Sequence, residues 1–512
     1  MHCRHNAEPF AIAALSIALA APIAAQGPMR LDALGGSFPG TLSVSLGPGP
    51  LFQFCIIAMG IDAGPLPIAV VDPADTRVLS VGLQQLDLYF GQFGFDQRYA
   101  LPGWTVPNVP AFLDVPLFFQ GLSFGGATTV FDEVSPPEAI RFAPAGVFRD
   151  RQVYMTDDRA FGTMIPRADG RWMIAGGGRG ALLAQVAVRT SEIYDDVTDA
   201  FVFGPQMNAY RSLHSATRLA DGRWLLAGGV NLTNDPQALC EIYDPVADAF
   251  TPVTSMGTAR AGHAAVLLAD GRVFISGGLD TVTTGIDTID HTLNTTEFYN
   301  PATNAWSPGP NLRTPRVGHV PIVRPNGTVL LAGGVSFDNL IIIKVPTVRA
   351  TTDLFSPATN AITAGPSMAS ARSLIDAVPL PNNRWLLAGG IASMTIANQG
   401  TPTAAAEVYD AVANTWSSAG AMATARANQR AIVLPNGSVL LVGGANGAIL
   451  TPTPLASGEI YNSSTNTFTT GPSLNVARAG AAAYATPQGQ VQVIGGGTTS
   501  GSIARVCEWY YF

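Results

Sequence analysis

Seven arginines recur at equivalent positions along the chain, and an acidic residue follows each of them further along. A guanidinium group can pair with a carboxylate inside a protein, or it can bind an anionic or polar ligand at the surface. The first interpretation predicts ion pairs that tie strands or neighbouring units together. The second predicts that some of the arginines line a ligand-binding face, and the sequence leaves both open. The arginines are Arg159, Arg211, Arg260, Arg316, Arg372, Arg426 and Arg478, and the acids are Glu192, Glu241, Glu297, Asp353, Glu407, Glu459 and Glu508.

Three histidines stand three residues after an arginine, at His214, His263 and His319. Histidine is a common zinc ligand, so equivalent positions in adjacent units suggest a metal site. The position belongs to the repeat itself, however, and the other copies hold Gly162, Ile375, Gln429 and Ala481 there. A packing role is therefore the favoured interpretation, and we expect no metal and no other cofactor.

The remaining chemistry-bearing patterns are sparse. The chain has no nucleophile elbow, phosphate-binding loop, zinc motif or calcium loop. The glycine-rich stretch Gly176–Gly180 follows an apolar run but does not begin a helix, as a phosphate-binding loop would. The net charge is −8 and no run of Lys or Arg occurs, which argues against a nucleic-acid partner. We therefore expect no catalytic residues.

These residues belong to a repeat that occurs about seven times. Each copy has two apolar runs joined by a turn, then a double glycine, a variable loop and an acid-x-aromatic signature such as Glu297-x-Tyr299. Asp-Gly and Asn-Gly pairs predict two-residue hairpin turns, which need positive φ. The double glycines permit close approach where a Cβ would clash. They lie at Gly176-Gly177, Gly228-Gly229, Gly277-Gly278, Gly333-Gly334, Gly389-Gly390, Gly443-Gly444 and Gly495-Gly496, with a mean spacing of about 53 residues.

This repeat resembles the kelch family, including the propeller domain of galactose oxidase. The resemblance covers Arg159 to the C-terminus. It implies an all-β fold, a seven-bladed kelch-type β-propeller whose blades stack in a closed ring. In kelch adaptors of ubiquitin ligases, arginines on the equivalent face bind acidic peptides. The arginines precede the first strands and share a face with the variable loops, where binding usually occurs. The candidate ligand-binding residues are Arg159, Arg211, His214, Arg260, His263, Arg316, His319, Arg372, Arg426 and Arg478.

Three further segments complete the expected organisation. Residues 1–25 have the pattern of a secretory signal peptide: a weakly basic start, a short apolar run and small residues near Ala25. Residues 26–135 lack the repeat. Their short apolar segments, separated by Gly- and Pro-rich turns, predict a small N-terminal β-sandwich. The propeller then occupies residues 136–512. Its seventh copy has no outer aromatic strand before Phe512, so we expect Ala139–Phe148 to close the last blade.

Two functions fit this organisation. The first is an exported, non-catalytic and monomeric propeller that binds a protein or glycan through the arginine-bearing face. It would have no membrane span, because no segment after the signal is long and apolar enough. The alternative is a carbohydrate-active enzyme, such as a sugar mutarotase or epimerase or an oxidase-like protein, that uses the channel mouth. Copper-radical chemistry is not expected, because no Tyr-His dipeptide occurs, no histidine follows His319 and we expect no C-terminal domain.

Overall fold

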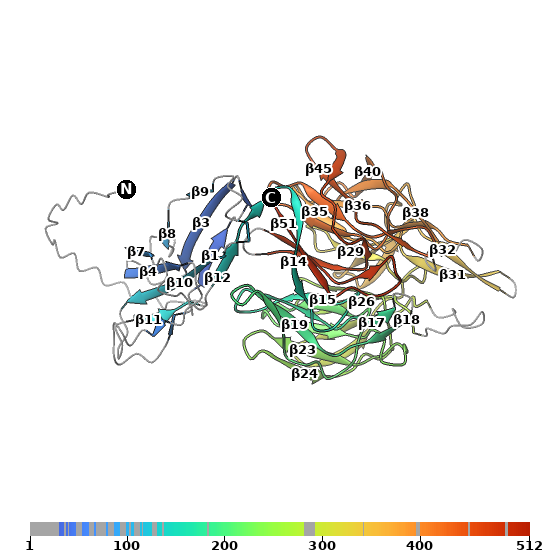
Figure 1. Cartoon of the computed structure of the whole chain (residues 1–512). Helices are drawn as coiled ribbons and strands as arrows, with labels where there is room; N and C mark the ends of the chain where they lie inside the picture. The colour runs from blue at the N-terminus through green and yellow to red at the C-terminus, as the bar shows by residue number, and fades with distance from the viewer. Residues whose placement is uncertain are drawn as a thin grey trace.

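A computed structural model places short antiparallel strands along most of the chain (Figure 1). The structure describes residues 30–34, 37–38, 40–47, 54–60, 66–67, 78–79, 87–92, 99–101, 104–106, 113–114, 116–124, 131–135 and 138–512, the last range with gaps at 182–183, 281–291, 341–342, 396–399, 449–450 and 487–489. The expected signal peptide, residues 1–25, lies outside them. Every regular element within the described residues is a strand. No helix in these ranges has the length and apolar character needed to cross a membrane.

Seven four-stranded antiparallel sheets, named here sheet 1 to sheet 7, follow one another in the part of the chain described from residue 147 onward. Sheet 1 contains β15 (Thr163–Pro166), β16 (Trp172–Ala175), β19 (Ser191–Asp195) and β20 (Ala200–Phe203). Sheet 2 contains β21 (Ser215–Arg218), β22 (Trp224–Ala227), β23 (Cys240–Asp244) and β24 (Ala249–Val253). Sheet 3 contains β25 (Ala264–Leu267), β26 (Val273–Ser276), β27 (Thr296–Asn300) and β28 (Ala305–Pro308). Sheet 4 contains β29 (Val320–Val323), β30 (Val329–Ala332), β33 (Thr352–Ser356) and β34 (Ala361–Ala364).

The remaining three sheets continue the series. Sheet 5 contains β35 (Ala377–Leu380), β36 (Arg384–Ala388), β39 (Ala405–Asp410) and β40 (Thr415–Ala421). Sheet 6 contains β41 (Arg430–Val433), β42 (Val439–Val442), β45 (Gly458–Asn462) and β46 (Thr467–Gly471). Sheet 7 contains β48 (Ala482–Ala485), β49 (Val491–Ile494), β51 (Val506–Tyr511) and β14 (Val147–Tyr154).

In sheets 1, 2, 3, 4 and 6, the Asp-Gly or Asn-Gly turn between the first two strands differs from the expected two-residue hairpin. In sheet 1, the Arg167 amide bonds the Arg171 carbonyl at 2.9 Å, so three residues lie between the paired positions. The Gly170 amide also bonds the Arg167 carbonyl at 3.2 Å, and Gly170 has φ of 85°. Asp169 is not in the left-handed region. These features describe a type I turn followed by a glycine bulge, which needs positive φ only at the glycine.

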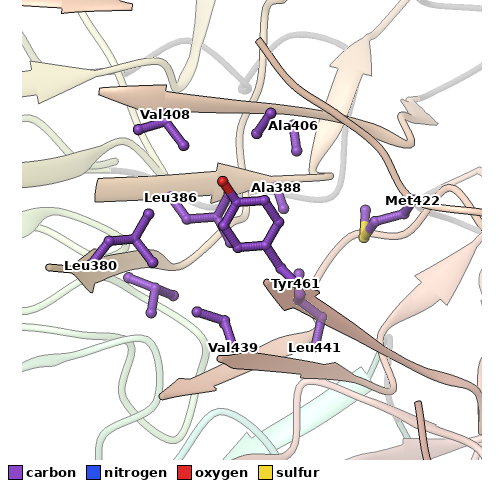
Figure 2. Close-up of a cluster of buried hydrophobic side chains, with 11 residues drawn as sticks. Leu380, Leu386, Ala388, Ala406, Val408, Met422, Val439, Leu441 and Tyr461 are labelled. Atoms are coloured by element: carbon purple, nitrogen blue, oxygen red, sulfur yellow. The ribbon is translucent and has the colours of Figure 1, made fainter. Parts of the chain in front are cut away.

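Apolar side chains fill the space between consecutive sheets. Figure 2 shows one such cluster, in which Leu386 and Val408 of sheet 5 face Tyr461 of sheet 6. Tyr461 also packs against Phe468 at a ring-centroid distance of 5.0 Å, and Tyr243 and Phe250 repeat this contact in sheet 2 at 4.9 Å. The acid-x-aromatic signature therefore places its aromatic residue in the layer between two sheets, as one sheet alone cannot bury both of its faces.

The first strands of the sheets lie next to one another in sequence order. β15 contacts β21, and the contacts continue through β25, β29, β35 and β41 to β48. β48 in turn contacts β15, so the series returns to its start.

The strand that completes sheet 7 comes from the region before the first repeat, but it begins later than expected. β14 (Val147–Tyr154) pairs with β51, with Phe148 opposite Tyr510 and Asp150 opposite Glu508. Of the expected segment Ala139–Phe148, only its last two residues belong to β14. β12 (Glu138–Arg141) pairs instead with β10 (Pro116–Phe124) of the N-terminal sheets. Both segments have apolar residues that can cover a sheet, so composition alone does not distinguish them.

The N-terminal strands form two sheets that share one apolar core. One contains β1 (Arg30–Leu34), β3 (Gly40–Gly47), β8 (Tyr99–Ala100) and β9 (Trp104–Val106); the other contains β4 (Phe54–Gly60), β7 (Asp87–Gln92), β10, β11 (Phe131–Val134) and β12. Leu46 of the first sheet and Phe119 of the second are both fully buried in the shared core. Shorter pairs are β2 (Ser37–Phe38) with β13 (Ala143–Pro144) and β5 (Leu66–Pro67) with β6 (Val78–Leu79). Ile140 and Phe142 belong to this core, so the N-terminal unit extends past the expected boundary at residue 135.

Candidate functional site

The seven repeat arginines are buried in ion pairs with the seven repeat acids. All seven arginine residues are 0% exposed. The guanidinium nitrogen lies 2.6 Å from the acid oxygen in Arg159–Glu192, 2.7 Å in Arg211–Glu241, Arg260–Glu297 and Arg372–Glu407, 3.0 Å in Arg426–Glu459 and 3.2 Å in Arg316–Asp353; Arg478 and Glu508 form the seventh pair.

Further hydrogen bonds occupy both partners of each pair. Arg260 also donates from Nη1 to the carbonyl of Gly277, the first residue of the double glycine, at 2.8 Å. Glu297 accepts from the backbone amides of Gly257 and Thr258 at 2.6 and 3.1 Å. Burial lowers the pKa of Arg260, and the Glu297 carboxylate opposes this shift. Since the guanidinium groups are buried and bonded, they do not present positive charge to a ligand, contrary to the expectation of an arginine-lined face.

The three candidate histidines pack between sheets. His263 Nε2 lies 2.8 Å from the Ser215 hydroxyl of the preceding sheet, and His319 Nε2 lies 2.8 Å from the Ser276 hydroxyl. Each imidazole rests on the first glycine of the preceding double glycine; a Cβ on Gly228 would be 3.0 Å from His263 Cε1. Burial and the nearby arginine charge lower the pKa of His263 to about 3, and the same causes lower the pKa of His214 and His319. All three imidazoles are therefore neutral at physiological pH.

A ring of backbone in the left-handed conformation surrounds a cavity of about 260 Å³ beside these histidines. Its members lie two residues after each arginine, and each except Leu213 donates its amide to the carbonyl of the equivalent residue in the preceding sheet, at 3.0 to 3.3 Å. The bond from Phe161 to Gly480 joins the first repeat to the last. The ring consists of Phe161, Leu213, Gly262, Gly318, Leu374, Asn428 and Gly480, with φ between 54° and 64°. We name this opening, with the cavity, the channel mouth.

Sequence reasoning missed this ring, although part of the signal was present. Three copies carry glycine and one carries asparagine at the position, which are the residues that most readily adopt positive φ. Phe161, Leu213 and Leu374 hide the pattern, because bulky residues rarely adopt this conformation.

One charged pair lines the cavity of the channel mouth. Arg430 Nη1 and Asp376 Oδ1 are 3.1 Å apart, and their side chains are 31% and 29% exposed. Arg430 Nε also donates to the Ala481 carbonyl at 2.5 Å, whereas its Nη2 has no hydrogen-bond partner among the described residues. The equivalent positions hold neutral residues in the other copies: Thr163, Ser215, Ala264, Val320 and Ala482. Sequence reasoning did not single out this pair, although its departure from the repeat was visible.

Hairpins of unequal length rise from the double glycines around the channel mouth. β31 (Val335–Leu340) and β32 (Ile343–Val348) form the hairpin of sheet 4, and β17 (Gly178–Ala181) and β18 (Ala184–Ala187) form that of sheet 1. Both project away from the N-terminal sheets (Figure 1). The shorter hairpins are β37 (Ile391–Ser393) with β38 (Thr401–Pro402) and β43 (Ala445–Asn446) with β44 (Thr453–Pro454). In sheet 7, β50 (Gly497–Thr498) pairs instead with β47 (Arg478–Ala479), which precedes the first strand of that sheet.

These hairpins support one another along part of the rim. β32 contacts β37, and β38 contacts β43, so the hairpins of sheets 4, 5 and 6 form one continuous wall. Ala181 forms a bridge with Ser502, which joins the loops of sheets 1 and 7. Sheet 2 carries only a compact turn around Asn231–Asp235, closed by a 3.0 Å backbone bond. The loop of sheet 3 includes residues 281–291, which lie outside the described residues. The rim is therefore higher over sheets 4 to 6 than over sheet 2.

No group of three His, Cys, Asp or Glu side chains is placed to hold a metal ion in the described ranges of the chain. The two bonded histidines use Nε2 on serine hydroxyls, and no carboxylate joins them. The described residues therefore do not fit a copper or zinc centre.

Comparisons with known proteins agree with this architecture. Residues 426–475 match the family model of the Kelch motif. The chain is similar in structure to a fungal alcohol oxidase of the AA5 family in complex with copper, with a TM-score of 0.53 and 16% identity over 72% of this chain and 76% of that chain. It also aligns with the structure of YjhT, with a TM-score of 0.43 and 17% identity over 58% of this chain and 93% of that one. A search of curated proteins gives no match. The motif and the first likeness support a kelch-repeat, propeller-like fold, and at this identity the likeness shows the fold alone.

Proposed function

We propose that this protein is a seven-bladed kelch-type β-propeller with an N-terminal β-sandwich, and that it binds a protein or glycan at the channel mouth without catalysis. The contacts from β48 back to β15 support a closed ring of sheets, since they make the first and last sheets neighbours. The shared core of the two N-terminal sheets supports a sandwich. The signal-like segment at residues 1–25 supports export, and we propose that the exported protein is a monomer.

The observation that carries the binding proposal is the combination of a polar mouth with a rim of unequal hairpins. The repeat arginines hold the scaffold, because their charges are already paired inside it. Ligand contacts are therefore assigned to residues that differ between repeats, namely the hairpins and the Asp376–Arg430 pair. Variable segments on a rigid scaffold are where binding sites usually lie.

The experiment is a binding screen of the mature protein against a glycan array and a displayed peptide library. Replacing the hairpin Val335–Val348 by a short turn, or substituting Arg430→Ala, is expected to weaken binding at least tenfold. Arg223→Ala, at the opposite end of the strands, is the control and should bind normally. The proposal fails if neither library gives a ligand, or if binding survives both changes at the mouth.

A carbohydrate-active enzyme is the second candidate, and the Asp376–Arg430 pair is the observation that favours it. A carboxylate and a guanidinium group together on a channel wall can move a proton and hold a hydroxyl or carboxylate of a sugar. The test is nuclear magnetic resonance of free sugars, where accelerated exchange between anomers would report mutarotation. If the protein turns over a sugar and Asp376→Asn abolishes this activity, the enzyme replaces the non-catalytic proposal. If no sugar tested is turned over, binding stays the proposed function.

A further inference from the structure

A second cavity lies between sheets 7 and 1, at the end of the strands that carries the Asp-Gly turns. Its volume is about 310 Å³. Strand β12 of the N-terminal unit closes one side of it through Glu138, Ala139 and Arg141. Trp172 of sheet 1 and Tyr484 of sheet 7 line this cavity and also the central channel, so they form the wall between the two. We name it the junction cavity.

Two residues that break the repeat contribute polar groups to its lining. Gln492 is 2% exposed and Tyr484 is 7% exposed. The position of Gln492 is apolar in every other copy, where it holds Met173, Leu225, Phe274, Leu330, Leu386 or Leu440. Tyr484 replaces aliphatic residues such as Ile165, Ile322 and Ile432, or Thr217 in sheet 2. A buried amide costs free energy unless its hydrogen bonds are made, so stability of the sheet does not explain the substitution.

The amide groups at this cavity have unused hydrogen-bonding capacity. The Tyr484 hydroxyl donates to Gln492 Oε1. The Gln492 amide nitrogen has no partner among the described residues, and neither has the side-chain amide of Gln490, which is 6% exposed and lines the same cavity. A bound hydroxyl group could satisfy them, because it can both accept and donate.

An aromatic surface lies beside these amides. The rings of Trp172 and Tyr484 stack with centroids 4.8 Å apart and an interplanar angle of 30°. Trp172 is half-buried and contributes part of its surface to the lining of the cavity. The same position holds valine in sheets 3, 4, 6 and 7, as at Val273 and Val329. A flat apolar surface next to hydrogen-bonding amides matches a molecule with one apolar face and a hydroxylated edge.

The arginines around the cavity are already paired with carboxylates. Arg171 lies 2.7 Å from Asp195 and 2.9 Å from Asp169. Arg141 pairs with Asp199 at 3.2 Å, and Arg151 pairs with the same carboxylate. Since no cation is left for an anionic ligand, the lining favours a neutral one.

We propose that the junction cavity binds a neutral pyranose ring, with its C–H face on Trp172 and its hydroxyl groups on Gln490 and Gln492. The volume is near the lower end for ligand pockets, roughly 300 Å³, which suits a single sugar ring. The site is separate from the channel mouth, since it lies at the opposite end of the strands. This proposal does not depend on the function proposed for the channel mouth.

The test uses the full mature protein and ligand-observed nuclear magnetic resonance with the methyl glycosides of glucose, galactose, mannose and N-acetylglucosamine. Gln492→Leu and Trp172→Val introduce residues that other copies of the repeat already carry, so both variants should fold. Each is expected to raise the Kd at least tenfold. Trp385→Val, the same change in sheet 5, is the matched control and should bind as the unchanged protein does.

Arg430→Ala separates this site from the channel mouth and should leave binding of these glycosides unchanged. The proposal is overturned if none of the glycosides receives saturation from the protein, or if Gln492→Leu binds as tightly as the unchanged protein. Loss of binding in Arg430→Ala with normal binding in Gln492→Leu would place the sugar at the mouth and would equally overturn it.

Discussion

Each repeat arginine joins three segments that are distant in the sequence. Arg372 bonds the Glu407 carboxylate and the carbonyls of Gly389 and Ala405, and Glu407 in turn accepts the amides of Ala369 and Ser370. A buried ion pair of this kind gives little net stability compared with an apolar pair, but removal of one partner leaves an uncompensated charge. The arginine is therefore needed once the acid is present.

Arg372→Ala is accordingly expected to lower the free energy of unfolding by about 3–5 kcal/mol. Arg223→Ala removes the pair with Asp221, in which both side chains are exposed, and should cost less than about 1 kcal/mol. Urea denaturation of the two variants measures the difference. Equal destabilisation would show that burial does not determine the contribution of these pairs.

The sequence indicated some of these residue-level features and not others. Alignment of the copies was sufficient to pair each arginine with an acid, because both recur in every repeat. It did not decide between a structural and a ligand-binding role, since that depends on burial. Gln492 could have been found, because an amide replaces six apolar residues at that position. The cavity beside Gln492 could not, because it is formed by β12, whose position the repeat does not determine.

At the scale of elements, sheet 7 is the exception among the repeat sheets, because its outer strand precedes the first repeat. β14 places Phe148 in the apolar layer against Tyr510, with ring centroids 5.3 Å apart. The adjacent residue Val147 is 42% exposed. This alternation follows from the opposite directions of successive side chains along a strand.

Phe148→Ala should therefore destabilise the protein by about 3–5 kcal/mol through the cavity it leaves, while Val147→Ala should change the free energy of unfolding by less than about 1 kcal/mol. Hydrogen exchange at the amides of β51 gives a direct measurement, since weaker pairing with β14 should speed exchange there. The assignment of β14 to sheet 7 would be contradicted if exchange in β51 were the same in both variants.

The sequence predicted that a strand from this region closes the last sheet, but it placed the strand eight residues too early. The double glycines, turns and aromatic signatures fix the inner elements of each copy, because those features recur. The closing strand occurs once and has no repeat to align it. Glu138–Arg141 and Val147–Tyr154 both contain apolar residues, so only pairing with β10 and β51 distinguishes them.

At the scale of the whole molecule, the N-terminal unit docks on the outer turn of sheet 1. The Ala139 amide bonds the Asp196 carboxylate at 3.1 Å, and Arg141 bonds the Asp196 carbonyl at 2.5 Å. Val197 packs against Phe118 and Ala139 in the same contact. Burial raises the pKa of Asp196 from its ordinary value of 3.8 to about 6, and the neighbouring Asp195 charge adds to the shift.

Asp196 should therefore make this contact weaker as the pH rises. The pKa of Asp196 is higher in the folded protein than in the unfolded chain. Its contribution to the free energy of unfolding is therefore fully present below about pH 3.8 and is lost as the pH rises to about 6. Asp196→Asn stays neutral and should stabilise the protein above about pH 7 by on the order of 1–3 kcal/mol, with little effect near pH 4. Thermal unfolding across this pH range measures it. The exposed Asp235→Asn is the control, and an identical pH profile for both variants would contradict the assignment.

The pairing of β14 with β51 also has a consequence for biosynthesis. β14 leaves the ribosome about 350 residues before its partner β51. At roughly 5–20 residues per second, translation leaves this strand without its partner for on the order of tens of seconds. An unpaired strand edge is prone to pair with other chains. During synthesis the edge of β14 is therefore open to such pairing until β51 has been translated.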